Sequence, residues 1–206
     1  MPSNDFRPDL WLIRHGETKW SLSGAHTGRT DIPLTPEGER HAAAIGRFLA
    51  DRPFALVLTS PLSRARETCR LSGYGDVAQI EPDLCEWDYG AYEGHTSDEI
   101  RQSVPDWTIW KSPVPGGETI QQVAARARKA IERANAVNRS GDVALFAHGH
   151  LLRVLTACWL GLEPDAGSLF ALATATISVL GYEHDTRVIS CWNISPELAC
   201  KMPGPG

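Results

Sequence analysis

Short apolar runs that alternate with helix-like segments constrain the fold of this chain more than any other feature. Three runs, residues 10–13 (LWLI), 54–59 (FALVLT) and 142–147 (DVALFA), have the length and composition of buried strands. Segments with helical periodicity separate them, for example residues 36–49 behind the start signal Thr35-Pro36. Strands that alternate with helices favour a mostly parallel sheet joined by right-handed crossovers. The sequence therefore predicts an α/β fold.

The remaining elements follow from the same kinds of pattern. Ser60-Pro61 is a second helix start, and we expect that helix to continue to about Leu71. Residues 83–115 are rich in aromatics, Gly and Pro, which predicts an irregular excursion. Further expected elements are a strand at 77–80, helices at 97–103, 117–138 and 151–160, and strands at 177–182 and 188–192 joined around His184-Asp185. The basic residues of the 117–138 helix are interpreted as a solvated face; they are Arg126, Arg128, Lys129 and Arg133.

Composition and charge narrow the class of protein. The chain has 206 residues, 42% hydrophobic and 22% charged, which is typical of one globular domain. Its formal net charge of -5 does not favour a nucleic-acid-binding surface. Residues 1–9 lack the apolar core of a targeting segment, and no apolar stretch has the length of a membrane span. The five cysteines are scattered and odd in number, so we interpret them as reduced thiols of a cytoplasmic protein.

Chemically active residue types follow three of the predicted strands. Ligands of open α/β sheets bind outside the carboxyl ends of the strands, so these residues are expected to meet at one edge. Glycines there let backbone approach a ligand closely, and the helix that follows the last strand offers free N–H groups. Two guanidiniums and two imidazoles at such an edge suit a tetrahedral dianion, with phosphate as the obvious candidate. The residues concerned are Arg14-His15-Gly16, Arg64 and His148-Gly149.

A histidine inside a cationic cluster has a specific chemical use. Neighbouring positive charge disfavours its protonated form, and a neutral imidazole can attack phosphorus and carry the phosphoryl group. The arginines would stabilise the charge on the transferred oxygens. In an alternative interpretation His148 and His150 form a metal-binding pair, but no carboxylate-rich partner motif accompanies them. We therefore expect a site that needs neither a metal nor a cofactor.

Three stretches of the sequence together resemble the histidine phosphatase superfamily, which includes the cofactor-dependent phosphoglycerate mutases. LIRHGET at residues 12–18 resembles the first signature of that family. TSPLSRARET at 59–68 and FAHGH at 146–150 resemble its second and third, in the expected order. The resemblance covers about residues 10–195 and implies a single-domain three-layer sandwich, with an irregular lid at about 87–115 and one domain over residues 1–206.

The resemblance implies roles for individual residues. His15 corresponds to the phosphorylated nucleophile, and Arg14, Arg64 and His148 correspond to the phosphate pocket. CEWDYGAYEG at 85–94 matches the segment that supplies the proton donor, which makes Glu86 the general acid. The like charge of a bound phosphate dianion would favour the protonated, proton-donating carboxyl. Further residues expected at the pocket mouth are Ser21, Ser23, Thr27, Gly28, Tyr89 and Gly149.

Two branches of the family fit the sequence. TKWSLSGAHTGRTDIPLT at 18–35 is close to the mutases, whereas residues 86–94 and PDWTIWKSPVPGGET at 105–119 resemble bacterial acid phosphatases and fungal sugar-bisphosphatases. The segment from 88 to 115 carries two basic and five acidic residues, which disfavours retention of a highly anionic mutase intermediate. We therefore predict a metal-independent phosphomonoesterase that acts on small phosphorylated metabolites. A phosphoglycerate mutase is the alternative, an inactive phosphate-binding regulator is a third hypothesis, and a homodimer is one candidate assembly.

Overall fold

The structure, a computed structural model, describes residues 7–137 and 141–196. Within these ranges six strands form one sheet in the order β3-β2-β4-β1-β5-β6. Their bounds are β1 (Leu10–Arg14), β2 (Leu56–Thr59), β3 (Gln79–Ile80), β4 (Val143–Ala147), β5 (Ile177–Glu183) and β6 (Thr186–Ile194). The first four strands pair in parallel, whereas β5 pairs antiparallel with β1 and β6. The predicted mostly parallel α/β sheet is confirmed, as is the hairpin around residues 184–185.

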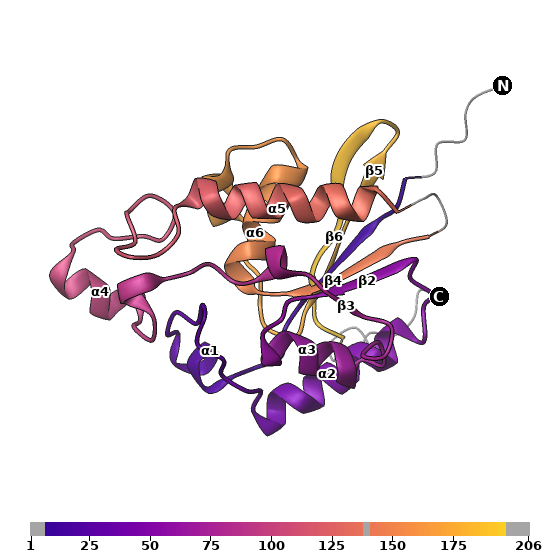
Figure 1. Cartoon of the computed structure of the whole chain (residues 1–206), viewed down its shortest axis with the longest axis horizontal. Coiled ribbons are helices and arrows are strands. Elements are labelled where there is room, and N and C mark those ends of the chain that lie inside the picture. The colour runs from indigo at the N-terminus through magenta and orange to yellow at the C-terminus, as the bar shows by residue number, and fades with distance from the viewer. Residues whose placement is uncertain (1–6, 138–140, 197–206) are drawn as a thin grey trace, which may run out of the picture.

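Helices cover both faces of the sheet and make the fold a three-layer sandwich (Figure 1). Helices α5 and α6 pack together over one face, and α2 and α3 pack together over the other. Helices α1 and α4 lie at one end of the molecule. The helices are α1 (Lys19–Ser23), α2 (Pro36–Leu49), α3 (Ser63–Leu71), α4 (Ser97–Ser103), α5 (Ile120–Asn135) and α6 (Gly149–Trp159), with 3-10 turns η1 (Pro82–Leu84), η2 (Gly90–Tyr92) and η3 (Pro164–Leu169).

Alternation along the central strands builds two separate cores. Leu10 and Leu12 of β1 belong to the core under α5 and α6, whereas Ile13 belongs to the core over α2 and α3. The same alternation divides β4, which is buried along its whole length. Because successive strand residues point to opposite faces, Arg14 shares the face of Leu12. The arginine at the end of β1 is therefore directed towards the start of α6.

Several predicted boundaries differ from the observed ones. Helix α3 begins at Ser63, not at Ser60, because the Ser60 hydroxyl accepts the hydrogen bond of a buried histidine instead of capping a helix. Helix α5 begins later than predicted because Thr119 forms its capping box with Gln122. Its predicted end at Asn138 lies outside the described residues. The short helix α1 was not expected, and it is capped at Thr18 by the same kind of box.

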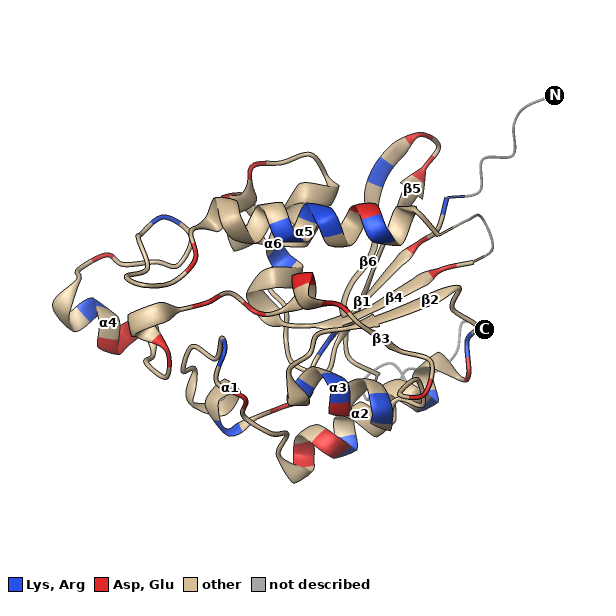
Figure 2. Ribbon diagram, in the orientation of Figure 1, with Lys and Arg blue, Asp and Glu red and all other residues tan. Residues whose placement is uncertain are grey.

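The basic residues of α5 do not form the uniform solvated face that the sequence indicated. Figure 2 shows acidic and basic residues interspersed on α2, α3 and α5. Arg128 and Lys129 are exposed, as expected. Arg126 is largely buried against Glu118, and Arg133 pairs with the buried carboxylate of Glu81. The helical period alone could not separate these two arginines from their exposed neighbours, because the carbonyls that Arg126 binds and the carboxylate of Glu81 come from the distant 81–86 segment.

A close approach between two backbones holds the loop after β1 against α2. A Cβ atom on Gly38 would lie 2.2 Å from the carbonyl oxygen of Glu17. A Cβ atom on Gly16 would lie 2.5 Å from the carbonyl oxygen of Gly38. Thr35 completes this contact, since its hydroxyl caps α2 and donates to the Glu17 carboxylate. Only glycine allows the loop that follows His15 to sit this close to the helix.

Gly38→Ala should therefore lower the free energy of unfolding by about 1–3 kcal/mol, because the added methyl group overlaps backbone that cannot move freely. Urea denaturation measures the change. Glu39→Ala, at the exposed neighbouring position, is the control and should change the value by less than about 0.5 kcal/mol. Equal stability of the Gly38 and Glu39 variants would contradict the packing described here.

Candidate active site

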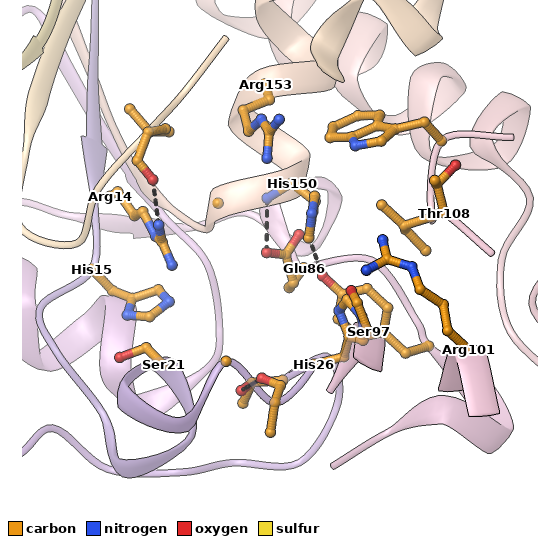
Figure 3. A pocket seen from close by; sticks show the side chains of 18 residues that line it. Arg14, His15, Ser21, His26, Glu86, Ser97, Arg101, Thr108, His150 and Arg153 are labelled. Atoms are coloured by element: carbon orange, nitrogen blue, oxygen red, sulfur yellow. Dashed lines mark hydrogen bonds between the residues drawn. The ribbon is translucent and has the colours of Figure 1, made fainter. Parts of the chain in front are cut away.

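A cavity of about 340 Å³ opens beyond the carboxyl ends of β1 and β4. Figure 3 shows Arg14 and His15 on one side of it, Glu86 and His150 in the middle, and Arg101 and Thr108 on the other side. The lining residues thus come from β1, α1, α4, α6 and the loops between them. They are Arg14, His15, Ser21, Gly24, Ala25, His26, Thr27, Glu86, Tyr89, Ser97, Arg101, Thr108, Ile109, Trp110, Gly149, His150, Arg153 and Leu172.

The imidazole of His15 is buried and held in one tautomer. Its Nδ1 lies 2.7 Å from the carbonyl oxygen of Gly16. A carbonyl can only accept a hydrogen bond, so Nδ1 carries the proton and Nε2 keeps a lone pair. Burial, together with the positive charges of Arg14 and Arg64, holds the pKa of His15 well below its ordinary value. His15 is therefore a neutral imidazole with a free ring nitrogen.

His148 lies beside His15, with 5.2 Å between the ring centroids. Its Nδ1 accepts a hydrogen bond from Nε of Arg64, so its Nε2 carries the proton and donates to Ser60 Oγ at 2.7 Å. Burial, then the charge of Arg64, holds the pKa of His148 well below its ordinary value. Both nitrogens of this ring are engaged within the protein, and the ring does not line the cavity surface.

The guanidinium of Arg64 is fully buried behind the cavity. Besides His148, it donates to the carbonyl oxygens of Thr27, Gly28 and Thr30 at 2.9–3.0 Å. These bonds fix the loop that follows α1. Arg64 thus places positive charge close to His15, but its side chain is surrounded by protein carbonyls and does not face the open cavity.

Arg14 lines the cavity directly, and its position depends on Gly149. A Cβ atom on Gly149 would lie 3.1 Å from Cζ of Arg14, so the guanidinium packs on the bare backbone at the start of α6. One of its nitrogens donates to the carbonyl of Leu172. Its Nε is buried without a hydrogen-bond partner among the described residues. A buried donor of this kind needs a partner, which an anionic ligand in the cavity can supply.

Glu86 occupies the N-terminus of α6. Its Oε2 accepts the backbone N–H of His150 at 3.0 Å, and its Oε1 accepts those of Leu151 and Trp87 at 2.9 Å each. The free N–H groups that the sequence suggested for a phosphate therefore bind this carboxylate. Oε2 makes one of these bonds and Oε1 makes two, which leaves Oε2 with the larger remaining capacity for a proton or a ligand.

The predicted residues at the pocket mouth divide into two groups. Ser21, Thr27, Tyr89 and Gly149 line the cavity, whereas Ser23 and Gly28 do not. Ser23 is exposed, and its hydroxyl donates to a carbonyl of its own helix. A Cβ atom on Gly28 would lie 2.4 Å from the carbonyl oxygen of Trp87. Gly28 is thus needed for close packing of the loop, which a sequence match cannot distinguish from ligand contact.

The outer half of the cavity contains residues that the sequence did not single out as a group. His150 lies 2.6 Å from the Tyr89 hydroxyl through its Nδ1, and its ring packs edge-on against Trp110. The guanidinium of Arg153 stacks on the same tryptophan, 4.5 Å from the ring centroid. The Thr108 hydroxyl is buried without a hydrogen-bond partner among the described residues. The spacing of His150 and Arg153, three residues apart on one helix, was the available signal for a shared face.

Within residues 7–137 and 141–196, no group of three or more His, Cys, Asp or Glu side chains is placed to bind a metal ion. The described cysteines Cys69, Cys85, Cys158 and Cys191 are free thiols, and Cys200 lies outside the described residues. In the same part of the chain, no helix has both the length and the apolar character of a membrane span.

Comparison with known proteins identifies the family. Residues 10–195 match the histidine phosphatase superfamily (branch 1). The chain belongs to this superfamily. An acid phosphatase of Mycobacterium tuberculosis is 40% identical over 183 residues, which cover 88% of this chain and 90% of that protein. A sedoheptulose 1,7-bisphosphatase of Saccharomyces cerevisiae is 38% identical over 192 residues, covering 79% of this chain and 70% of that protein.

A solved structure agrees with this assignment. The product of an open reading frame from Mycobacterium tuberculosis superimposes with a TM-score of 0.87 at 38% identity, over 92% of this chain and 98% of that one. The histidine phosphatase described here is therefore an enzyme that hydrolyses phosphate monoesters of small molecules. The resemblance drawn from the three sequence signatures is confirmed.

The buried histidines make the stability of this histidine phosphatase depend on pH. Burial lowers the pKa of His26 to about 4, and it holds those of His15, His148 and His150 well below their ordinary values. As pH falls below about 6.5, the histidines bind protons in the unfolded chain but not in the folded chain, so the free energy of unfolding falls. Each such group contributes up to about 1.4 kcal/mol per pH unit until its folded-state pKa is reached.

His26→Gln should therefore reduce the dependence of unfolding free energy on pH between about 6 and 4.5 by up to about 1.4 kcal/mol per pH unit. Urea denaturation at several pH values measures this slope. Ser23→Ala, an exposed substitution that replaces no titratable group, is the control and should leave the slope unchanged. The same slope in wild type and His26→Gln would contradict a buried neutral His26.

Proposed function

We propose that the enzyme works through a covalent phosphohistidine at His15, with Glu86 as the proton donor. The observation that carries this proposal is the state of His15. It is a neutral imidazole with its lone pair on Nε2, placed at the rigid end of β1 beside Arg14. The neighbouring Arg14 supports this role, because its buried Nε has no hydrogen-bond partner among the described residues and can donate to a phosphate oxygen.

In the first step Nε2 of His15 attacks the phosphorus in line with the ester oxygen. The new N–P bond forms as the P–O ester bond breaks, and Arg14 stabilises the charge on the transferred oxygens. The leaving alkoxide takes a proton from Glu86. The Oε2 atom is the favoured carrier of that proton, because it accepts one backbone N–H where Oε1 accepts two.

In the second step water attacks the phosphohistidine. Glu86 is now a carboxylate and takes a proton from the water as its oxygen approaches phosphorus. The N–P bond breaks, which returns His15 to its neutral form and releases inorganic phosphate. Arg64 and His148 support both steps from behind the cavity. Arg64 holds the loop after α1 and binds the His148 ring, which in turn lies beside the ring of His15.

The outer cavity indicates the kind of alcohol that the enzyme accepts. Arg101 and Arg153 line this region together with the Thr108 hydroxyl, which has no hydrogen-bond partner in the described part of the chain. Guanidiniums suit an anionic group, and an unpaired buried hydroxyl suits a substrate hydroxyl. We therefore propose a hydroxylated substrate with a second anionic group, such as a sugar bisphosphate, the substrate class in the name of the yeast relative.

The charges that line the cavity differ from the charges counted along residues 88–115 of the sequence. The five acidic residues of the 88–115 segment do not line the cavity. Asp88 pairs with Arg29, and Asp98 forms an exposed ion pair with Arg101. Glu93 binds backbone N–H groups at Gly28 and Thr30, and Glu99 caps α4. Arg153 adds a cation that comes from α6 and was outside the count. Glu86 is the one acidic side chain among the described residues that line the cavity.

His15→Ala should lose at least about three orders of magnitude in turnover, since it removes the ring nitrogen that attacks phosphorus in the proposed mechanism. Acid-labile, base-stable label from a labelled phosphate ester should appear on the wild type and be absent from the variant. Glu39→Ala, an exposed change outside the cavity, controls for general damage. Near-normal activity of His15→Ala would overturn the mechanism.

The same preparation separates hydrolysis from mutase chemistry. We expect phosphate release from several monoesters and little interconversion of 3- and 2-phosphoglycerate, even with 2,3-bisphosphoglycerate supplied. The outer cations make this comparison necessary, because they also suit a mutase intermediate. Mutase turnover about tenfold above hydrolysis, a difference of about 1.4 kcal/mol between transition states, would favour the alternative function.

Arg101→Gln should lower kcat/KM for a sugar bisphosphate about tenfold more than for the corresponding sugar monophosphate, because one charge-assisted contact is lost only with the bisphosphate. Steady-state phosphate release with both esters measures the difference. Lys111→Gln is the matched control, since Lys111 is an exposed cation of the same segment that does not line this cavity. Equal losses on the two esters would exclude an anion subsite at Arg101.

A further inference from the structure

Glu86 stands on a segment with little regular structure of its own. The 3-10 turn η1 ends at Leu84, and the next, η2, begins at Gly90. The carboxylate is held on the cavity side by three backbone N–H groups, two of them from α6. Those bonds fix the head of the side chain. The backbone that carries Glu86 must be fixed by something else, because a proton donor works only within hydrogen-bond reach of the leaving oxygen.

Arg126 supplies contacts to that backbone from helix α5. Its guanidinium donates to the carbonyl oxygens of Asp83 and Cys85 at 2.9 Å each, and to that of Glu86 at 3.4 Å. Its remaining bonds go to the Glu118 carboxylate, at 2.7 Å from Nε and 2.8 Å from Nη2. The side chains of Arg126 and Glu118 are 17% and 16% exposed. The pair is thus well shielded and geometrically defined.

Glu118 makes corresponding contacts to the residues after Glu86. Its carboxylate accepts the backbone N–H of Asp88 at 3.0 Å, and its backbone N–H donates to the Asp88 carbonyl at 3.0 Å. Its own carbonyl accepts the indole N–H of Trp87 at 2.8 Å. The ion pair therefore holds the chain on both sides of Glu86, through Arg126 before it and through Glu118 after it.

We propose that Arg126, oriented by Glu118, is the positioning residue that sets the reach of Glu86 toward the leaving oxygen. This rests on the proposed function, in which Glu86 is the proton donor. Arg126 does not line the cavity, so it acts on the reaction through the backbone of the segment that carries Glu86. Its loss lets the 83–88 segment shift, which weakens proton delivery more than attack by His15.

Leaving-group dependence distinguishes this role from general stabilisation. An alkyl phosphate needs a proton on its leaving oxygen, whereas a nitrophenyl phosphate needs little. Arg126→Gln should lower kcat on an alkyl phosphate at least about thirtyfold and on p-nitrophenyl phosphate less than about threefold. Arg126→Lys, which keeps the charge but cannot reach three carbonyls and a carboxylate together, should show an intermediate loss with the same selectivity.

Arg133→Ala is the matched control. Arg133 lies on the same helix and pairs with buried Glu81 of the same loop, but it makes none of the contacts to Glu86. Its replacement should affect both esters equally. All variants are compared at a temperature where circular dichroism shows them folded. If Arg126→Gln does not fold, Arg126→Lys takes its place in the comparison of the two esters.

A double-variant cycle with Glu86→Gln completes the test. If Arg126 acts through Glu86, Arg126→Gln should add no further selective loss on the alkyl ester in the Glu86→Gln background. A selective loss that persists there, or equal losses on both esters in the Arg126 variants, would overturn the positioning role alone. Equal losses on both esters in Glu86→Gln itself would overturn the proton-donor assignment of the proposed function, and the positioning role with it.

Discussion

The buried guanidinium of Arg64 is the interaction on which the rest of the site depends. A charge without solvent must be satisfied by protein dipoles, and here three loop carbonyls and the His148 ring do so. These bonds join α3, the loop after α1 and the start of α6 into one unit. Glu93 strengthens it by binding two N–H groups of the same loop. Burial, with the positive charges of Arg14 and Arg64, holds the pKa of His15 well below its ordinary value.

The N-terminus of α6 binds a different anion from the one that the sequence suggested. Helix N-termini favour anions, and the sequence suggested that a phosphate would use this one. The structure gives its N–H groups to Glu86, so the helix binds the enzyme's own carboxylate. In the proposed mechanism, phosphate recognition depends on Arg14, which packs on Gly149 and whose Nε has no hydrogen-bond partner among the described residues. Glu86, the proposed proton donor, and Arg14, the proposed phosphate ligand, are thereby held side by side against the first turn of one helix.

The chemistry of the outer cavity depends on which side chains turn inward. Acidic residues outnumber basic ones along the 88–115 segment, yet they pair with arginine, bind backbone N–H groups or face solvent. The inward-facing charges are cationic, and one of them, Arg153, comes from α6. The neutral His26 and His150 and the buried Tyr89 surround them. An extended substrate with both hydroxyl and anionic groups matches this lining.

The sequence by itself determined the sheet class, the alternation of elements and the residues that follow each strand. Apolar periodicity and helix caps such as Thr35 are local properties, so they could be interpreted without the fold. The convergence of Arg14, His15 and His148 followed as well, because parallel strands end at one edge. Only the tertiary structure decided that Arg64 lies behind the cavity, that Glu86 caps α6 and that Arg126 is buried while Arg128 is exposed. Each of these depends on hydrogen-bond partners 30 or more residues away in the chain, and no local pattern specifies such a partner.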